Sequence, residues 1–219
     1  MRLYQPKFSI AVMILAFGGA GLTTLTLASD YDITINTASL NGTDASLAFD
    51  LVSGGSFGNS ATISDFVTNG IPTVNGPNSG AVFGALPGTV TLSDSSFFNE
   101  YLEGITLGST VSFQLDVTSH APTGGALPDT FSLFVLDSSA ASSLLTTTDP
   151  SGADALVSIQ INGSASGILG VYTATPGVMA TVTPAQPSTG VPEPDVLTLM
   201  ILGVSAAAIF RRMGRRRRL

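Results

Sequence analysis

Short runs of alternating apolar and polar residues recur along the chain, and clusters of Gly, Pro, Asn and Asp separate them. The clearest run covers residues 110–118, where Val111, Phe113, Leu115 and Val117 alternate with polar side chains. A period of two places the apolar side chains on one face of an extended strand. The pattern therefore predicts half-buried β-strands rather than helices.

The same alternation occurs in residues 129–137 and again in residues 157–161, which end at the turn signal Asn162-Gly163. Weaker alternation predicts further strands at residues 31–38, 45–52, 61–67, 89–92, 168–175 and 178–183. Only residues 95–102 favour a helical turn, because their large apolar side chains lie near helical spacing. About nine or ten short strands predict an all-β fold, a single β-sandwich of jelly-roll or immunoglobulin-like type.

Charge is divided sharply along the sequence. All eight Lys and Arg residues lie within residues 1–7 or 211–219, whereas thirteen of the fifteen acidic residues lie within residues 29–190. With thirteen acids and no base, that central part has a formal charge of −13. It offers no basic surface for phosphate groups, so nucleic acid is not an expected partner. Cysteine is absent, which excludes disulfides and thiolate chemistry.

The N-terminus carries Arg2 and Lys7 and then a largely apolar stretch up to Leu27, as a secretory signal peptide does. Small residues precede the next polar segment, so we predict cleavage by signal peptidase after Ala28; the alternative is an uncleaved N-terminal membrane helix. Residues 1–28 are then the signal peptide and residues 29–183 an acidic β-sandwich domain. Residues 184–190 contain two prolines and no apolar periodicity, which predicts an extended linker.

The C-terminus combines three elements within residues 191–219: a Pro-Glu-Pro motif, an apolar segment at 196–210 that predicts a transmembrane helix, and an Arg-rich end. The arginines are costly to desolvate and would stop at the cytoplasmic face of the membrane. The residues concerned are Pro192, Glu193, Pro194, Arg211, Arg212, Arg215, Arg216, Arg217 and Arg218.

In its order of elements, this tail resembles the PEP-CTERM sorting signal of exported proteins from Gram-negative bacteria that make extracellular polysaccharide. The resemblance implies that an exosortase, a membrane-embedded cysteine protease, cuts near Pro192-Glu193-Pro194. It also implies export through the inner membrane, where the chain is anchored before cleavage, and release to the cell surface or extracellular matrix afterwards. The alternative is a permanent tail anchor. The resemblance covers the C-terminal signal and implies nothing about the remaining chain.

Candidate catalytic residues are few. His120 is the one histidine, and its Ser-His-Ala-Pro context lacks a nucleophile motif, which favours a surface loop over a Ser-His-Asp site. Three pairs of carboxylates are the nearest candidates for a glycosidase: Glu100 with Glu103 on a helical turn, Asp30 with Asp32 on one strand face, and Asp149 with Asp154. Solvated surface acids are the favoured interpretation of these pairs, and a polysaccharide hydrolase is the third-ranked function.

The sequence also raises binding functions. Asp149 and Asp154 flank a loop that could wrap a calcium ion, although a plain turn is the favoured interpretation and no cofactor is required. Tyr31, Tyr101 or Tyr172 could form the aromatic platform of a carbohydrate-binding module, which is the second-ranked function. The first-ranked hypothesis is a non-enzymatic, exosortase-processed protein with a structural or adhesive role in the envelope or exopolysaccharide.

Overall fold

The computed structural model describes residues 27–164 and 167–185. Within these residues the chain forms fourteen β-strands, of which four contain only two or three residues. The prediction of an all-β fold is confirmed. The described residues contain one helical element, the 3-10 helix Ala38–Leu40 (η1), and no helix there is long and apolar enough to span a membrane. The helix predicted at 196–210 lies outside them.

Two six-stranded antiparallel sheets carry the fold, and we call them sheet A and sheet B. Sheet A has the order Met179–Pro184 (β14), Leu27–Asn36 (β1), Thr110–Ser119 (β8), Ser60–Thr68 (β3), Val90–Ser93 (β6) and Val82–Gly84 (β5). Sheet B has the order Ile168–Val171 (β12), Val157–Ile161 (β11), Asp129–Asp137 (β9), Asp44–Val52 (β2), Phe98–Thr106 (β7) and Ile71–Pro72 (β4). A separate ribbon pairs Thr146–Thr147 (β10) with Ala174–Thr175 (β13).

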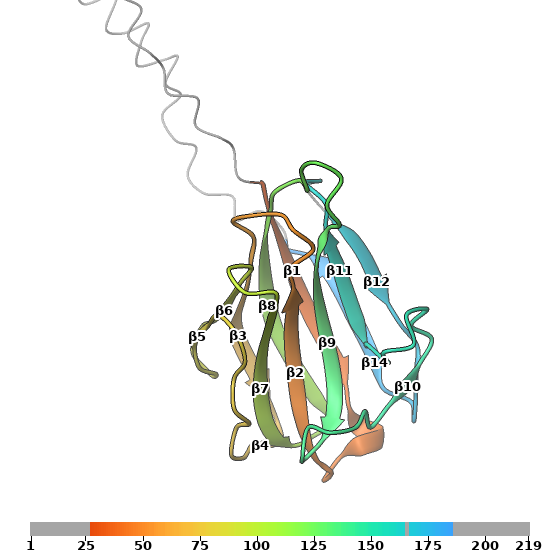
Figure 1. The fold of residues 1–219 in the computed structure, drawn as a ribbon. Coiled ribbons are helices and arrows are strands. Elements are labelled where there is room, and N and C mark those ends of the chain that lie inside the picture. Colours follow the sequence, from red (N-terminus) through yellow and green to blue (C-terminus); the bar gives the residue numbers. More distant parts are fainter. Residues whose placement is uncertain (1–26, 165–166, 186–219) are drawn as a thin grey trace, which may run out of the picture.

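The two sheets pack face to face around one apolar core (Figure 1). Phe49 of sheet B meets Phe113 of sheet A edge to face, with ring centroids 5.3 Å apart. Alternating residues of β8 point into this core, as the sequence pattern predicts: Val111, Phe113, Leu115 and Val117 are buried. Burying these inward faces supplies the main driving force for folding, because the described residues contain neither disulfides nor salt bridges that could replace it.

Strands pair in a nested order. β3 pairs with β6. β2, which precedes β3 in the chain, pairs with β7, which follows β6, and β1 pairs with β8 in the same way. Each pair therefore encloses the previous one in sequence. Members of each pair lie in the same sheet, while successive pairs alternate between sheets A, B and A. The chain from β1 to β8 thus behaves as one long antiparallel ribbon folded over the core.

Three loops gather at one end of the molecule: residues 53–59, 94–97 and 120–128, which we call the loop cluster. The strand registers place them together, because Val52 pairs with both Phe98 and Thr130, and Ser60 pairs with Ser93. The first and last described residues lie at this end too. β1 begins where Leu27 pairs with Ser119, and the Ala185 amide donates to the Asp30 carbonyl at 2.7 Å. Figure 1 shows the start of β1 beside these loops.

The helical turn predicted at residues 95–102 is wrong. Residues 94–97 form a turn, and the chain then enters β7 at Phe98. Apolar residues occur on both faces of β7, since Tyr101 faces the core while Leu102 is covered by the segment around Gly76. Two buried faces produce apolar spacing that imitates a helix.

The single strand predicted at 168–175 is also wrong in detail. It divides into β12, at the edge of sheet B, and β13, which pairs with β10 instead. The turn predicted at Asn162-Gly163 is present: Gly163 has a φ of +82°, and the Ser164 amide donates to the Asn162 side chain at 3.0 Å. Only glycine adopts that φ without steric cost.

Candidate functional site

The most unusual ionisable pair lies on the outer face of sheet B, where Asp50 of β2 stands directly opposite Glu100 of β7. Leu47, Phe49 and Leu51 of β2 point into the core, so the intervening Asp50 side chain points away from it. Its Oδ1 atom is nevertheless buried and accepts no hydrogen bond. Like charges that face each other across an antiparallel pair repel, and residues 27–164 and 167–185 contain no Lys or Arg that could compensate.

Burial, and secondly the charge of the neighbouring Glu100, raise the pKa of Asp50 to about 7. Burial also raises the pKa of Glu100. Near neutral pH a substantial fraction of the molecules therefore carries a protonated Asp50. The sequence contains no signal that marks Asp50, because no local pattern connects residues fifty positions apart.

A second carboxylate pair occupies sheet A, where Asp30 of β1 is opposite Asp116 of β8. Burial raises the pKa of Asp116, and the charge of Asp30 and a hydrogen bond with it act in the same direction. Asp30 and Asp32 share the exposed face of β1, as predicted, with Tyr31 buried between them. Across the described ranges, no three His, Cys, Asp or Glu side chains gather in a way that could hold a metal ion.

The candidate pair Glu100 and Glu103 does not form, and the favoured interpretation as solvated surface acids is wrong for Glu103. Both residues lie on β7 three positions apart, so their side chains leave the strand on opposite faces. Glu103 is buried, and its Oε2 accepts hydrogen bonds from the Tyr101 hydroxyl at 2.8 Å and the Asn75 amide at 2.9 Å. This carboxylate fastens the segment before β5 to the sheet. It is not placed to act with Glu100 on a substrate.

A buried carboxylate also organises the loop cluster. Asp129 is completely buried, and its two oxygens accept from the Gly54 amide at 2.7 Å and the Asn59 side chain at 2.8 Å. Asn59 Oδ1 in turn accepts from the His120 amide at 2.7 Å. His120 is half-buried in its loop and has Asn59, rather than a serine nucleophile, beside its ring at 3.3 Å. Asp129 therefore joins two loops to the edge of the core.

Replacing Asp129 by Ala should destabilise the domain by about 2 to 3 kcal/mol, because buried amide donors of Gly54 and Asn59 lose their acceptor. Urea unfolding of residues 29–190 measures this change. Asp94→Ala provides the matched control. Asp94 accepts a hydrogen bond from the backbone N–H of Asn59, at a less buried position of the same loop cluster. Equal losses in the two variants would contradict the assigned role of Asp129.

Asp149 and Asp154, the calcium candidates, are engaged in hydrogen bonds within their own loop. Asp149 accepts from the Ser151 amide and hydroxyl, at 2.9 and 2.6 Å, and Asp154 accepts from the Thr147 amide at 2.8 Å. Partial burial opposes the ionisation of Asp149, but the bonds from Ser151 and Ala155 outweigh it and lower the pKa. These carboxylates serve as turn acceptors, the favoured interpretation of the sequence.

The tyrosines predicted as an aromatic platform are mostly inaccessible. Tyr31 is 2% and Tyr101 1% exposed, so neither can stack on a sugar at the surface. Tyr172 is half-buried, and its hydroxyl lies 2.9 Å from the Ser158 hydroxyl. The platform hypothesis is therefore wrong for Tyr31 and Tyr101.

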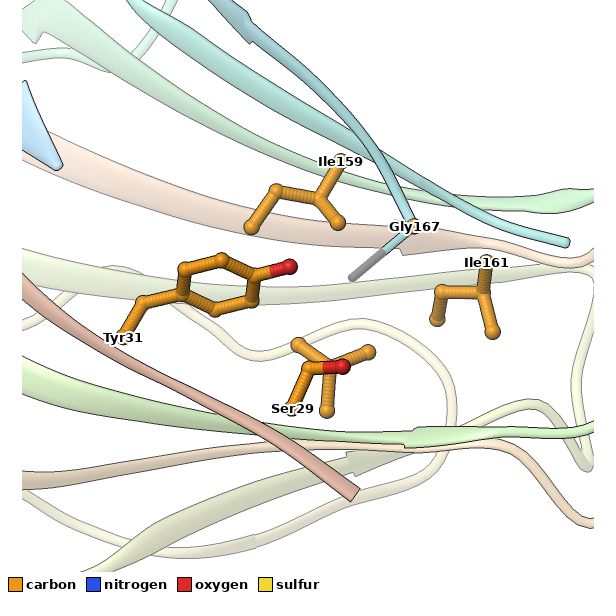
Figure 2. Close-up of a pocket in the computed structure, with 6 residues that line it drawn as sticks. Ser29, Tyr31, Ile159, Ile161 and Gly167 are labelled. Atoms are coloured by element: carbon orange, nitrogen blue, oxygen red, sulfur yellow. The ribbon is translucent and has the colours of Figure 1, made fainter. Parts of the chain in front are cut away.

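Tyr31 instead lines a small space between the two sheets. Figure 2 shows its hydroxyl pointing along the core between Ile159 and Ser29, toward Gly167. Burial raises the pKa of Tyr31, and a hydrogen bond with Ser29 opposes that shift. The space is too narrow to admit a water molecule, so it is an imperfection of the core packing rather than a ligand site.

The predicted processing sites lie at the chain termini. Ala28 is the second residue of β1 and pairs with Thr118, so the bond predicted for signal-peptidase cleavage lies within the strand as described. Pro184, assigned to the linker, is the last residue of β14. The predicted sorting residues lie outside the described residues: Pro192, Glu193, Pro194, Arg211, Arg212, Arg215, Arg216, Arg217 and Arg218.

No family model, curated protein or solved structure matches this chain.

Proposed function

We propose that this chain is an exported, non-enzymatic protein whose C-terminal tail is a PEP-CTERM-type sorting signal, processed by an exosortase. The mature domain then serves a structural or adhesive role in the envelope or the extracellular polysaccharide matrix. One observation carries the proposal: the ordered succession of Pro192-Glu193-Pro194, the apolar residues 196–210 and the six arginines within residues 211–218.

The central domain suits this role. It carries thirteen acidic residues and no basic ones within residues 29–190, which favours solubility and self-repulsion outside the membrane. We further propose that the two packed sheets form a β-sandwich of jelly-roll type. The nested pairs β3 with β6, β2 with β7 and β1 with β8 support that choice, because a rolled antiparallel ribbon pairs its strands in this order.

The described carboxylates also agree with a structural role. Glu103 and Asp129 are buried and hold loops, while Asp149 and Asp154 accept bonds within a turn. The hydrolase hypothesis loses its first candidate pair, since Glu100 and Glu103 lie on opposite faces of β7.

Mass spectrometry of the chain isolated from its native envelope and culture medium tests the proposal. We expect a mature form that begins at Ser29 and ends close to Pro192-Glu193-Pro194. Glu193→Gln, which keeps the side-chain size but removes the charge of the recognition motif, should leave the Arg-rich tail attached. An intact tail on the wild-type chain would instead identify a permanently anchored membrane protein.

A further inference from the structure

Three large apolar side chains of the loop cluster are exposed to solvent: Phe57 is 85%, Phe97 76% and Leu127 73% exposed. Their loops adjoin one another. The Ser53 amide donates to the Phe97 carbonyl at 2.8 Å, and Gly54 lies so close to the Leu127 backbone that a Cβ atom there would collide with it. Exposed apolar side chains grouped in this way mark an interaction surface more often than isolated ones do.

The loop cluster is nearly free of charge. Of the domain's thirteen acidic residues, only Asp94 and the buried Asp129 belong to these loops or border them directly. Asp94 accepts a hydrogen bond from the backbone N–H of Asn59 at 2.8 Å. Loops 53–59 and 120–128 contain no acidic residue. An apolar surface with few charges can approach lipid without desolvating carboxylates, which is the largest obstacle for a domain this acidic.

The position of the chain ends favours a membrane as the partner of the loop cluster. Leu27 and Ala185 both lie at the end that carries the loop cluster. Ten residues, 186–195, separate Ala185 from the apolar segment that begins at Val196. A fully extended chain of that length spans at most about 35 Å, so an anchored tail holds this end, rather than the opposite one, next to the membrane.

We propose that the loop cluster rests on the bilayer surface, with Phe57, Phe97 and Leu127 inserted among the lipid headgroups while the tail is anchored. Aromatic side chains favour this interfacial region. Contact at the loops orients the domain with both sheets directed away from the membrane and brings the linker to the membrane surface. This proposal rests on the proposed membrane anchoring of the tail.

The absence of tryptophan from the chain allows a direct test. Phe57→Trp and Phe97→Trp introduce single fluorescent probes into the loop cluster. Val74→Trp is the matched control, because Val74 is 92% exposed and lies beside Gly104, near the opposite end of β7. The full chain is reconstituted into phosphatidylcholine vesicles with brominated acyl chains, circular dichroism confirms folding, and flotation reports insertion.

We expect emission from Phe57→Trp and Phe97→Trp to shift to shorter wavelength and to be quenched by brominated lipid, while Val74→Trp shows neither change. Chains that float with the vesicles but show equal, weak quenching at all three positions would overturn the proposal and leave the anchor intact. Chains that fail to float would overturn the anchor and this proposal together. A blue shift that needs no lipid and grows with protein concentration would assign the surface to a second copy and overturn lipid contact.

Discussion

Replacing Asp50 by Asn is expected to stabilise the domain at pH 8 by on the order of 4 kcal/mol and to leave its stability nearly unchanged at pH 4. The folded state raises the pKa of Asp50 from 3.8 to about 7, mainly because the carboxyl is buried and secondly because Glu100 faces it. The folded protein therefore binds this proton more tightly than the unfolded chain does. Ionisation of Asp50 at high pH therefore destabilises the folded protein. Asn cannot ionise, so the substitution removes this destabilisation.

The direction of the pH dependence follows from that difference. Below about pH 4 the carboxyl is protonated in both states and contributes no difference in stability. Between the two pKa values the folded protein loses about 1.4 kcal/mol of stability for each unit of increasing pH, and above about pH 7 the loss is complete. Urea unfolding of residues 29–190 at pH 4, 6 and 8 should show this slope in the wild type and a flatter profile in Asp50→Asn.

Asp32→Asn is the matched control for that experiment. Asp32 is an exposed aspartate on the outer face of β1, so its replacement removes one negative charge without removing a buried one. The difference between the two variants at pH 8 isolates the effect of burial from the general self-repulsion of an acidic domain. Equal stabilisation by both substitutions would contradict the role assigned to Asp50.

Phe49→Ala is expected to destabilise the domain by about 4 kcal/mol, enough to unfold a large fraction of the molecules in a marginally stable domain. Phe49 is completely buried at the centre of β2 and joins the sheets through its edge-to-face contact with Phe113. It also lies 6.3 Å, centroid to centroid, from the ring of Tyr101. Truncation leaves a cavity that rigid strands on both sides cannot close.

The control for Phe49→Ala is Phe97→Ala, which should change the free energy of unfolding by less than about 0.5 kcal/mol because the Phe97 side chain is largely exposed. Thermal or urea unfolding measures both variants. A similar loss in the two would show that Phe97 packs against the domain, which would also remove it from the proposed membrane surface. A large loss of stability in Phe49→Ala and a small one in Phe97→Ala would distinguish an apolar residue that stabilises the fold from one that remains available for a partner.

Local sequence patterns predicted much of the fold. Residues 129–137 and 157–161 form β9 and β11 with the predicted bounds, and the apolar stripe of residues 110–118 faces the core. Alternation succeeds there because one face of each strand is buried and the other is solvated. It failed at β7, where the segment around Gly76 covers Leu102 and leaves apolar residues on both faces.

The ionisable groups were harder to predict. Glu100 and Glu103 are close in sequence but are separated by the pleat of β7, whereas Asp50 and Glu100 are distant in sequence and meet across a strand pair. The buried role of Asp129 is equally nonlocal, because its hydrogen-bond donors come from the loop that follows β2. Which carboxylates meet depends on strand register, and no short sequence motif specifies register between separated strands.

By itself, the sequence determined the strand-forming periodicity, the confinement of basic residues to the two termini and the three-part C-terminal tail, because composition and local spacing contain each of these features directly. Only the tertiary structure decided the nested pairing of β1, β2 and β3 with β8, β7 and β6. It also decided the burial of Asp50 beside Glu100. The same holds for the loop cluster, which places the exposed Phe57, Phe97 and Leu127 at the end of the domain where β1 begins. The physical reason is that side-chain periodicity reports which faces of a strand avoid water, whereas the neighbours of those faces depend on how distant strands pair to close a shared core.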